Sequence, residues 1–287
     1  MARLLAALLS TAVAAAPAGA QTDTRPAFAV ATIKRNTTGA DAQSMRLQPG
    51  GRIVVTNQPL RRLVVFAYGL QPQQLAGGPA WLDTDRFDIV AQAEGDISPT
   101  PPGGPPGPAQ LMMQRLLAER FGLAVHTEPR EMAVYALTLA RSDARLGPRI
   151  KPATVDCLAL MTKAPGGVPV VAPQLPDGRP ACGVRRDATG RVTAGGTTML
   201  MFATQILTGQ ADRLVIDRTG LTAAYDFDYE FTPDLPGRGD GAASATAVAE
   251  RPGLFTALEE QLGLKLQATR APMTVTVIDR VTPPTEN

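Results

Sequence analysis

The residue types that could do chemistry gather mainly in two acidic clusters. They are Asp83, Asp85 and Asp88 in the string WLDTDRFD, and Asp226, Asp228 and Glu230 in YDFDYEF. Paired carboxylates perform glycoside hydrolysis, and carboxylate oxygens bind calcium or magnesium. Neither cluster has the D-x-D-x-D-G pattern of a calcium-binding loop. In YDFDYEF acidic and aromatic residues alternate, which favours a strand with a buried aromatic face and a solvated acidic face over a weak cation site.

Candidates for nucleophilic catalysis are few. His126 is the only histidine, and alternation in LAVHT places it on the solvent face of a strand. Four serines follow residue 20, and none lies in a G-x-S-x-G elbow: Ser44, Ser98, Ser142 and Ser244. We therefore expect no catalytic residues, no metal site and no cofactor. The enzymatic alternative is a carboxylate-dependent hydrolase in which one acidic cluster meets the other.

The N-terminus and the cysteines both point to export. Residues 1–20 contain one Arg, an apolar run and a terminal Ala18-Gly19-Ala20, the pattern of a Sec-type signal peptide cleaved near Ala20–Gln21. The chain has two cysteines, Cys157 and Cys182, and an oxidising compartment favours a disulfide between them over a pair of free thiols. We expect a periplasmic or secreted protein with no transmembrane segment once the signal is removed.

The charge balance limits the partners. Twenty-eight Lys and Arg stand against 26 Asp and Glu, a formal net charge of +2, so the chain lacks the basic excess of a nucleic-acid binder. The remaining partner classes are an unidentified envelope protein and a small-molecule or glycan ligand.

Two segments of the chain resemble two later ones at a nearly constant offset. Residues 51–82 align without a gap with residues 190–221, and both contain the apolar stripe of an amphipathic helix. In the first copy Asn57 is a plausible helix cap and Gly69 a plausible stop. A second block, near residues 117–134, recurs at 258–275. Repetition in the same order at nearly the same offset indicates an internal duplication.

The expected fold is α+β, with two tandem similar modules, each of two helices packed on a small mixed or antiparallel sheet. The modules are expected at residues 24–141 and 186–287, joined by a Pro/Gly-rich linker at 142–185 that holds the cysteine pair. The second helix of each module ends at Gly122 or Gly263 and is expected to precede a hairpin of two short strands.

Two turns at equivalent joints of the modules are candidates for a contact surface. The Gly77-Gly78-Pro79 turn directs Trp81 and Leu82 toward the core, and a polar turn follows the same joint in the second copy. The candidate contact residues are Trp81, Asp83, Asp217, Arg218 and Thr219.

Long strings of the chain resemble a secreted bacterial family, domain of unknown function 3738. They include PGGRIVVTNQPLRRLVVFAYGLQ, LAGGPAWLDTDRFDIVAQAEG, LLAERFGLAVHTEPREMAVYALTLAR and VIDRTGLTAAYDFDYEFTPD. The resemblance implies an extracytoplasmic location, and it implies sensing or interaction because the family's domain is also fused to membrane metallopeptidase sensors. The family defines no catalytic residues that could be transferred. Ala223-Ala224 departs from its usual Gly and basic residue.

These observations favour a non-catalytic binding, sensor or adaptor protein of unknown ligand. Two similar modules form a natural groove, and exposed sheet edges accept partner strands. A carboxylate-dependent envelope hydrolase and a purely structural envelope protein are the alternatives.

Overall fold

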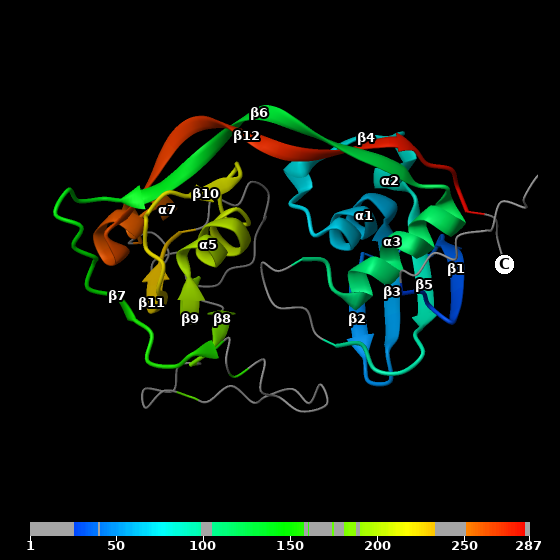
Figure 1. The fold of residues 1–287 in the computed structure, drawn as a ribbon, viewed down its shortest axis with the longest axis horizontal. Coiled ribbons are helices and arrows are strands. Elements are labelled where there is room, and N and C mark those ends of the chain that lie inside the picture. The colour runs from blue at the N-terminus through cyan, green and yellow to red at the C-terminus, as the bar shows by residue number, and fades with distance from the viewer. Residues whose placement is uncertain are drawn as a thin grey trace, which may run out of the picture.

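The computed structural model describes residues 26–39, 41–98, 105–157, 160, 174, 181–187, 190–232 and 251–284. The predicted signal peptide and its cleavage site lie outside these residues. The described part is α+β, with three four-stranded sheets and few helices (Figure 1).

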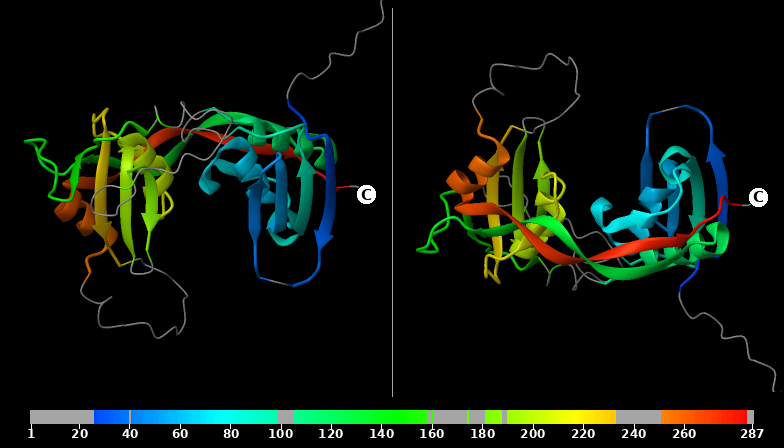
Figure 2. Two further views of the ribbon diagram at one scale, coloured as in Figure 1. Left: turned by 90° about the horizontal axis from the view of Figure 1, so that it is seen from below. Right: turned by 90° about the horizontal axis from the view of Figure 1, so that it is seen from above.

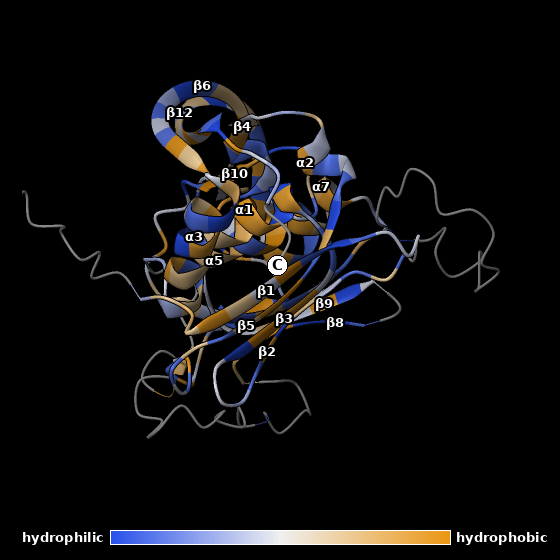
Figure 3. Ribbon diagram, turned by 90° about the vertical axis from the view of Figure 1, so that its right-hand side faces the viewer, coloured by the Kyte–Doolittle hydropathy of each residue, from blue (hydrophilic) through white to orange (hydrophobic). Residues whose placement is uncertain are grey.

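The N-terminal lobe is an antiparallel sheet covered by helices on one face. Its strand order is β1 (Val30–Asn36), β5 (Arg86–Gln92), β3 (Arg52–Pro59), β2 (Ser44–Gln48). Its helices are α1 (Leu60–Tyr68), α2 (Trp81–Thr84) and α3 (Pro108–Phe121). The hydrophobic colouring of β1, β3 and β5 in Figure 3 follows this core.

The predicted amphipathic helix of the first copy is confirmed in α1. Leu60, Leu63, Val64 and Ala67 form its buried stripe, and Gly69 ends it in the left-handed conformation at φ 62°. The expected cap at Asn57 is wrong, because Pro59 precedes the helix and Asn57 is part of β3.

The C-terminal lobe has a second antiparallel sheet. Its order is β7 (Ile150–Pro152), β11 (Ala224–Glu230), β9 (Arg191–Thr198), β8 (Gly183–Arg186). The helix α5 (Met199–Met201) continues as the π-helical η3 (Phe202–Leu207), and α7 (Leu254–Ala257) continues as the π-helical η4 (Leu258–Leu262). Strand β7 and most of β8 lie within residues 142–185, so part of the expected linker forms strands of this sheet.

A long two-stranded ribbon joins the lobes (Figures 1 and 2). Strands β6 (Ala124–Leu139) and β12 (Leu264–Arg280) pair antiparallel along their length. Each begins in one lobe and ends in the other. The end of β12 pairs in parallel with β4 (Leu75–Gly77), which follows the short η1 (Pro72–Gln74), and the end of β6 pairs with β10 (Val215–Asp217).

The expected hairpins after the second helices are therefore wrong. Residues 123–127 and 134–139 were expected as separate strands, but β6 runs through both without a turn. The intervening polar residues pair with β12, with Glu131 opposite Pro272. A partner strand far along the chain, which local patterning does not reveal, keeps this segment extended.

The predicted disulfide is confirmed. Cys157 is bonded to Cys182, with 5.6 Å between their Cα atoms. Cys157 lies against strand β9 at Gly196, whose φ is +58°, and a Cβ on Gly196 would overlap the Cys157 sulfur. The disulfide thus packs directly on the sheet, and only glycine fits beneath it.

Among the residues that the structure describes, no helix is long and apolar enough to cross a bilayer.

Candidate functional site

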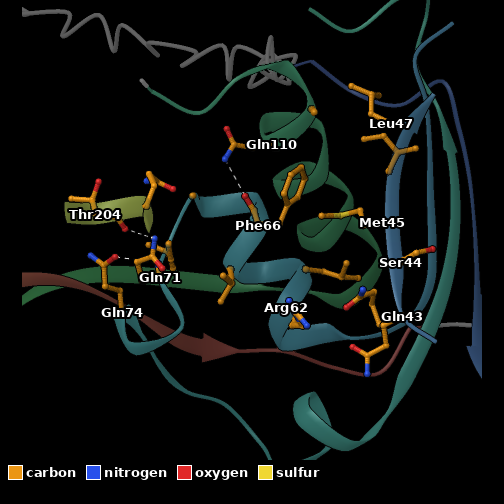
Figure 4. A pocket seen from close by; sticks show the side chains of 18 of the residues that line it. Gln43, Ser44, Met45, Leu47, Arg62, Phe66, Gln71, Gln74, Gln110 and Thr204 are labelled. Atoms are coloured by element: carbon orange, nitrogen blue, oxygen red, sulfur yellow. Dashed lines mark hydrogen bonds between the residues drawn. The ribbon is translucent and has the colours of Figure 1, made fainter. Parts of the chain in front are cut away.

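A groove of about 1040 Å³ opens over the outer face of α1 and receives residues from both lobes. Strand β2 forms one wall through Met45 and Leu47, and η1 forms another through Gln74 and the preceding Gln71 (Figure 4). The C-terminal lobe closes the groove with residues of α5 and η3: Leu200, Thr204 and Gln205. The groove therefore depends on both lobes.

Side-chain amides dominate the polar lining. The described part of the lining includes six glutamines: Gln43, Gln58, Gln71, Gln74, Gln110 and Gln205. Arg62 is the only charged residue among the described residues of the lining. The apolar lining includes side chains that remain well exposed, with Leu47 at 50% and Leu200 at 58%. The lining suits a ligand with both hydrogen-bonding and apolar groups.

Three of these amides hold the groove's own walls. Gln71 Nε2 donates to Thr204 O across the lobes at 2.9 Å, and Gln71 N donates to Gln74 Oε1 at 3.1 Å. Gln110 receives a hydrogen bond from Gly107 N and donates to Phe66 O at 3.1 Å, which ties the start of α3 to α1 (Figure 4).

A β-bulge in β3 positions Gln58 at the groove. The pairing of β3 with β5 shifts register between Val55 and Gln58, and Asn57 between them has a left-handed φ of 54°. Asp88 on β5 secures the bulge, because its Oδ1 accepts the Asn57 N–H at 2.8 Å and the Asn36 amide at 2.9 Å. Bulges of this kind redirect a side chain and are frequent beside functional sites.

Gln58 carries an unsatisfied polar atom. The residue is 8% exposed, and its Oε1 is buried with no hydrogen-bond partner among the described residues. Leaving a buried acceptor unpaired costs about 1–3 kcal/mol. The last torsion of a glutamine side chain is soft, so rotation of the amide can present this oxygen to a ligand in the groove.

The three carboxylates of the first acidic cluster each contact a different partner within the N-terminal lobe. Asp83 Oδ1 accepts from Arg61 Nε at 2.8 Å, and Asp85 Oδ1 accepts from Arg35 at 2.8 Å. Asp88 accepts the Asn57 N–H at the bulge.

The second acidic cluster corrects an expectation. Its aromatic face is buried as predicted, but the acidic face is not solvated: Asp226 is 2% and Asp228 8% exposed. Asp226 Oδ1 accepts the Gly196 N–H at 3.0 Å, and Asp228 accepts from Arg191 at 2.8 Å. Alternation alone identified the strand but not the groups packed on its second face.

Tyr229 lies on the buried aromatic face of β11, among other aromatic rings. Its ring lies 5.8 Å from the rings of Phe202 and Phe231, and its hydroxyl donates to Gln210 at 2.7 Å. Burial raises the pKa of this hydroxyl far above its usual range.

His126 is half-exposed, as expected, but has partners that the sequence did not indicate. Its Nδ1 lies 2.7 Å from Asp279 Oδ1 on β12, and Glu128 also lies near its ring. Glu128 forms an ion pair with Arg130, which lowers the pKa of that carboxyl below its usual value. Within the described residues, no group of three or more His, Cys, Asp or Glu side chains is arranged to hold a metal ion.

The candidate contact residues lie outside the groove lining. Trp81 and Asp83 are in α2, and Trp81 packs edge-on against Phe87. The other turn is held by its own side chains: Asp217 Oδ1 accepts from Thr219 N at 2.8 Å, and Arg218 N donates to Leu137 O.

The sequence predicted a groove between the modules but indicated neither Gln58 nor the other residues that line it. One signal was available, because the alignment of the two copies sets Asn57 opposite Gly196, and glycine opposite asparagine indicates a left-handed backbone. A left-handed Asn57 within a strand indicates a bulge, and a bulge changes the direction of the next side chain, Gln58.

Comparison with known proteins gives a family but no activity. No curated protein and no solved structure matches the chain. A family model described as a protein of unknown function, DUF3738, matches residues 61–281, which include α1 except its first residue, the C-terminal wall of the groove and the whole β6–β12 ribbon. The chain is therefore a member of the DUF3738 family.

Proposed function

We propose that the protein is an exported binding, sensor or adaptor protein, and that the groove between its lobes is its ligand site. The observation that carries this proposal is Gln58, a nine-tenths buried side chain in the groove whose amide oxygen has no partner within the described part of the chain. Proteins rarely leave such atoms unpaired, and those that occur need a specific explanation. A ligand that donates a hydrogen bond to Gln58 supplies one.

The contacts of the acidic residues favour binding over carboxylate catalysis. Asp88 and Asp226 both accept backbone N–H groups at bulges, and Asp85 forms an ion pair with Arg35. Each of these carboxylates thus has a structural role within its own lobe.

The disulfide supports export, because disulfides persist in oxidising compartments. A signal peptide at residues 1–20, cleaved near Ala20–Gln21, accounts for such a location. The periplasm or the exterior of the cell is the compartment that we propose.

The two lobes, in this proposal, descend from an internal duplication. The two outer sheets have corresponding orders, β1-β5-β3-β2 and β7-β11-β9-β8. The bulge contact recurs, with Asn57 N–H on Asp88 in one sheet and Gly196 N–H on Asp226 in the other. The ribbon is symmetric about the pair Glu131 and Pro272, which occupy equivalent positions of the two copies.

Thermal-shift screening of the mature, oxidised protein tests the binding function. The probes are a panel of linear peptides and a panel of neutral oligosaccharides, because a ligand that binds the native state raises the melting temperature. Leu200→Arg fills the groove with a charge, and Phe255→Arg is the matched control on an exposed residue outside the groove lining, 41% exposed against 58% for Leu200.

We expect the shift from an active probe to disappear in Leu200→Arg and to persist in Phe255→Arg. An equal shift in both variants would show that binding occurs elsewhere and would refute the groove as the site.

A further inference from the structure

We propose that the groove binds an extended polypeptide segment, which pairs with the free edge of β2, places apolar side chains against Met45 and Leu47, and sets an acidic side chain on Arg62. This proposal rests on the groove being the ligand site and names the chemistry of its ligand.

The edge of β2 can accept a strand. Strand β2 is the last strand of its sheet, and in the described part of the chain no strand pairs with its outer edge. It is the strand of this sheet that lies nearest to the other lobe (Figures 1 and 2). Such an edge presents backbone N–H and C=O groups to a partner, and natural proteins usually protect it. Strand β2 contains neither Pro nor Lys, and its one charged residue, Arg46, alternates with Met45 and Leu47 and so lies on the opposite face of the strand.

The inner face of β2 supplies apolar contacts beside that edge. Met45 pairs with Val55 and Leu47 pairs with Ile53, so both side chains share the face that is buried in β3. Val55 and Ile53 are nearly inaccessible, but Met45 is 36% and Leu47 50% exposed where they line the groove. Alternate residues of a paired strand point to one face, so a bound segment would place every second side chain on this surface.

The positive charge of Arg62 favours a ligand with an acidic group. Among the described residues that line the groove, Arg62 is the only charged one, and no ion pair joins it to another described residue. It lies toward Gln43 in the groove (Figure 4). A ligand carboxylate on Arg62 gains a charge-assisted hydrogen bond without a competing acid in the lining.

A polypeptide fits these features better than a glycan. The described lining has one aromatic ring, Phe66, on which a sugar could stack, whereas it offers a strand edge, exposed aliphatic side chains and amides. Gln58, once rotated, accepts a hydrogen bond from a peptide N–H, and the amides of Gln43 and Gln205 in the lining can do the same. Strand addition of this kind draws affinity from the main chain and specificity from alternate side chains.

A displayed library of random 12-residue linear peptides, selected on the mature, oxidised protein, is the direct test. Enriched peptides are synthesised and their affinities measured by fluorescence anisotropy. We expect micromolar binders with apolar residues at alternate positions and an acidic residue. Methylating the peptide's backbone nitrogens one at a time should weaken binding at least tenfold at every second position, because only alternate N–H groups face β2.

Variants of the protein locate the peptide. Leu47→Lys should abolish binding, whereas Val184→Lys, on the corresponding edge strand β8 and 43% exposed, should leave it unchanged. Gln58→Met should weaken binding at least tenfold while the protein unfolds at the same or a higher denaturant concentration, because the substitution removes an unpaired buried oxygen. Arg62→Gln should lose at least tenfold for acidic peptides at low salt, and the loss should shrink at high salt.

The proposal would be overturned by an empty selection, by binding that ignores the position of backbone methylation, or by equal effects of Leu47→Lys and Val184→Lys. Binding of a neutral oligosaccharide, lost in Gln58→Met, would keep the groove as the site but refute the peptide. Failure of both peptides and oligosaccharides to bind at the groove would refute the proposed function as well.

Discussion

Replacing Gly196 by alanine tests the packing of the disulfide on strand β9. Gly196 has φ +58°, and an added Cβ would overlap the Cys157 sulfur and lie 3.0 Å from the Cys157 Cβ. An alanine in the left-handed region costs about 1–2 kcal/mol. Overpacking a filled interior adds about 1–3 kcal/mol. We therefore expect Gly196→Ala to lower the free energy of unfolding by about 2–5 kcal/mol.

Gly220→Ala is the matched control for backbone strain. Gly220 has φ +71°, and no atom lies within 4 Å of its added Cβ. This variant should lose only the strain contribution, about 1–2 kcal/mol. The two variants thus differ in the steric contact alone.

Urea unfolding followed by far-UV circular dichroism measures both losses, with the slope against denaturant checked for constancy. Repeating Gly196→Ala in a background with both cysteines changed to alanine removes the sulfur. The excess over Gly220→Ala should then fall, as a coupling in a double-mutant cycle. A Gly196→Ala variant that loses no more than Gly220→Ala, or an excess unchanged without the sulfur, would refute the reasoning.

Three further predictions follow from the contacts described. Changing both cysteines to alanine opens a loop of 25 residues and should lower the free energy of unfolding by about 3.5 kcal/mol in the chain-entropy estimate, measured by urea denaturation; an unchanged midpoint would contradict it. Asp88→Ala should lower the free energy of unfolding by about 1.5–3 kcal/mol, because it removes the acceptor of the Asn57 N–H at the bulge. Asp83→Ala breaks a half-exposed ion pair and should lower it by at most about 1 kcal/mol. Equal losses of stability in thermal unfolding would argue against the bulge contact. Arg130→Gln should raise the pKa of Glu128 in an NMR titration, because Arg130 lowers it. The ion pair stabilises the folded protein above the usual pKa of a glutamate, and this stabilisation is lost as the pH falls through the lowered pKa of Glu128. The free energy of unfolding of the variant should therefore change less on acidification than that of the unchanged protein.

The sequence predicted the elements whose structure follows from the spacing of apolar residues within one segment. The apolar stripe of α1 and its glycine stop follow from helix periodicity, and the buried aromatic face of β11 follows from alternation. The disulfide follows from the cysteine count and the compartment.

The features that the sequence did not reveal depend on distant partners. The run from Ala124 to Leu139 is one strand because β12 lies beside it, and residues 128–132 alone resemble a turn. Asp226 and Asp228 are buried because a bulge N–H and Arg191 meet them from β9. The groove forms where α1 approaches η3, and its key residue, Gln58, is aimed by a left-handed asparagine.

The crossing of β6 and β12 has a consequence for how the chain folds. Strand β12 follows all the other described elements, yet β4 of the N-terminal lobe pairs with its far end, and Ile278 packs into the core of that lobe. The N-terminal lobe therefore stays incomplete until β12 has been synthesised. Pairing of Ala124 with Arg280 closes a very long loop, and such high contact order slows folding. Loss of β12 would therefore disrupt both lobes at once.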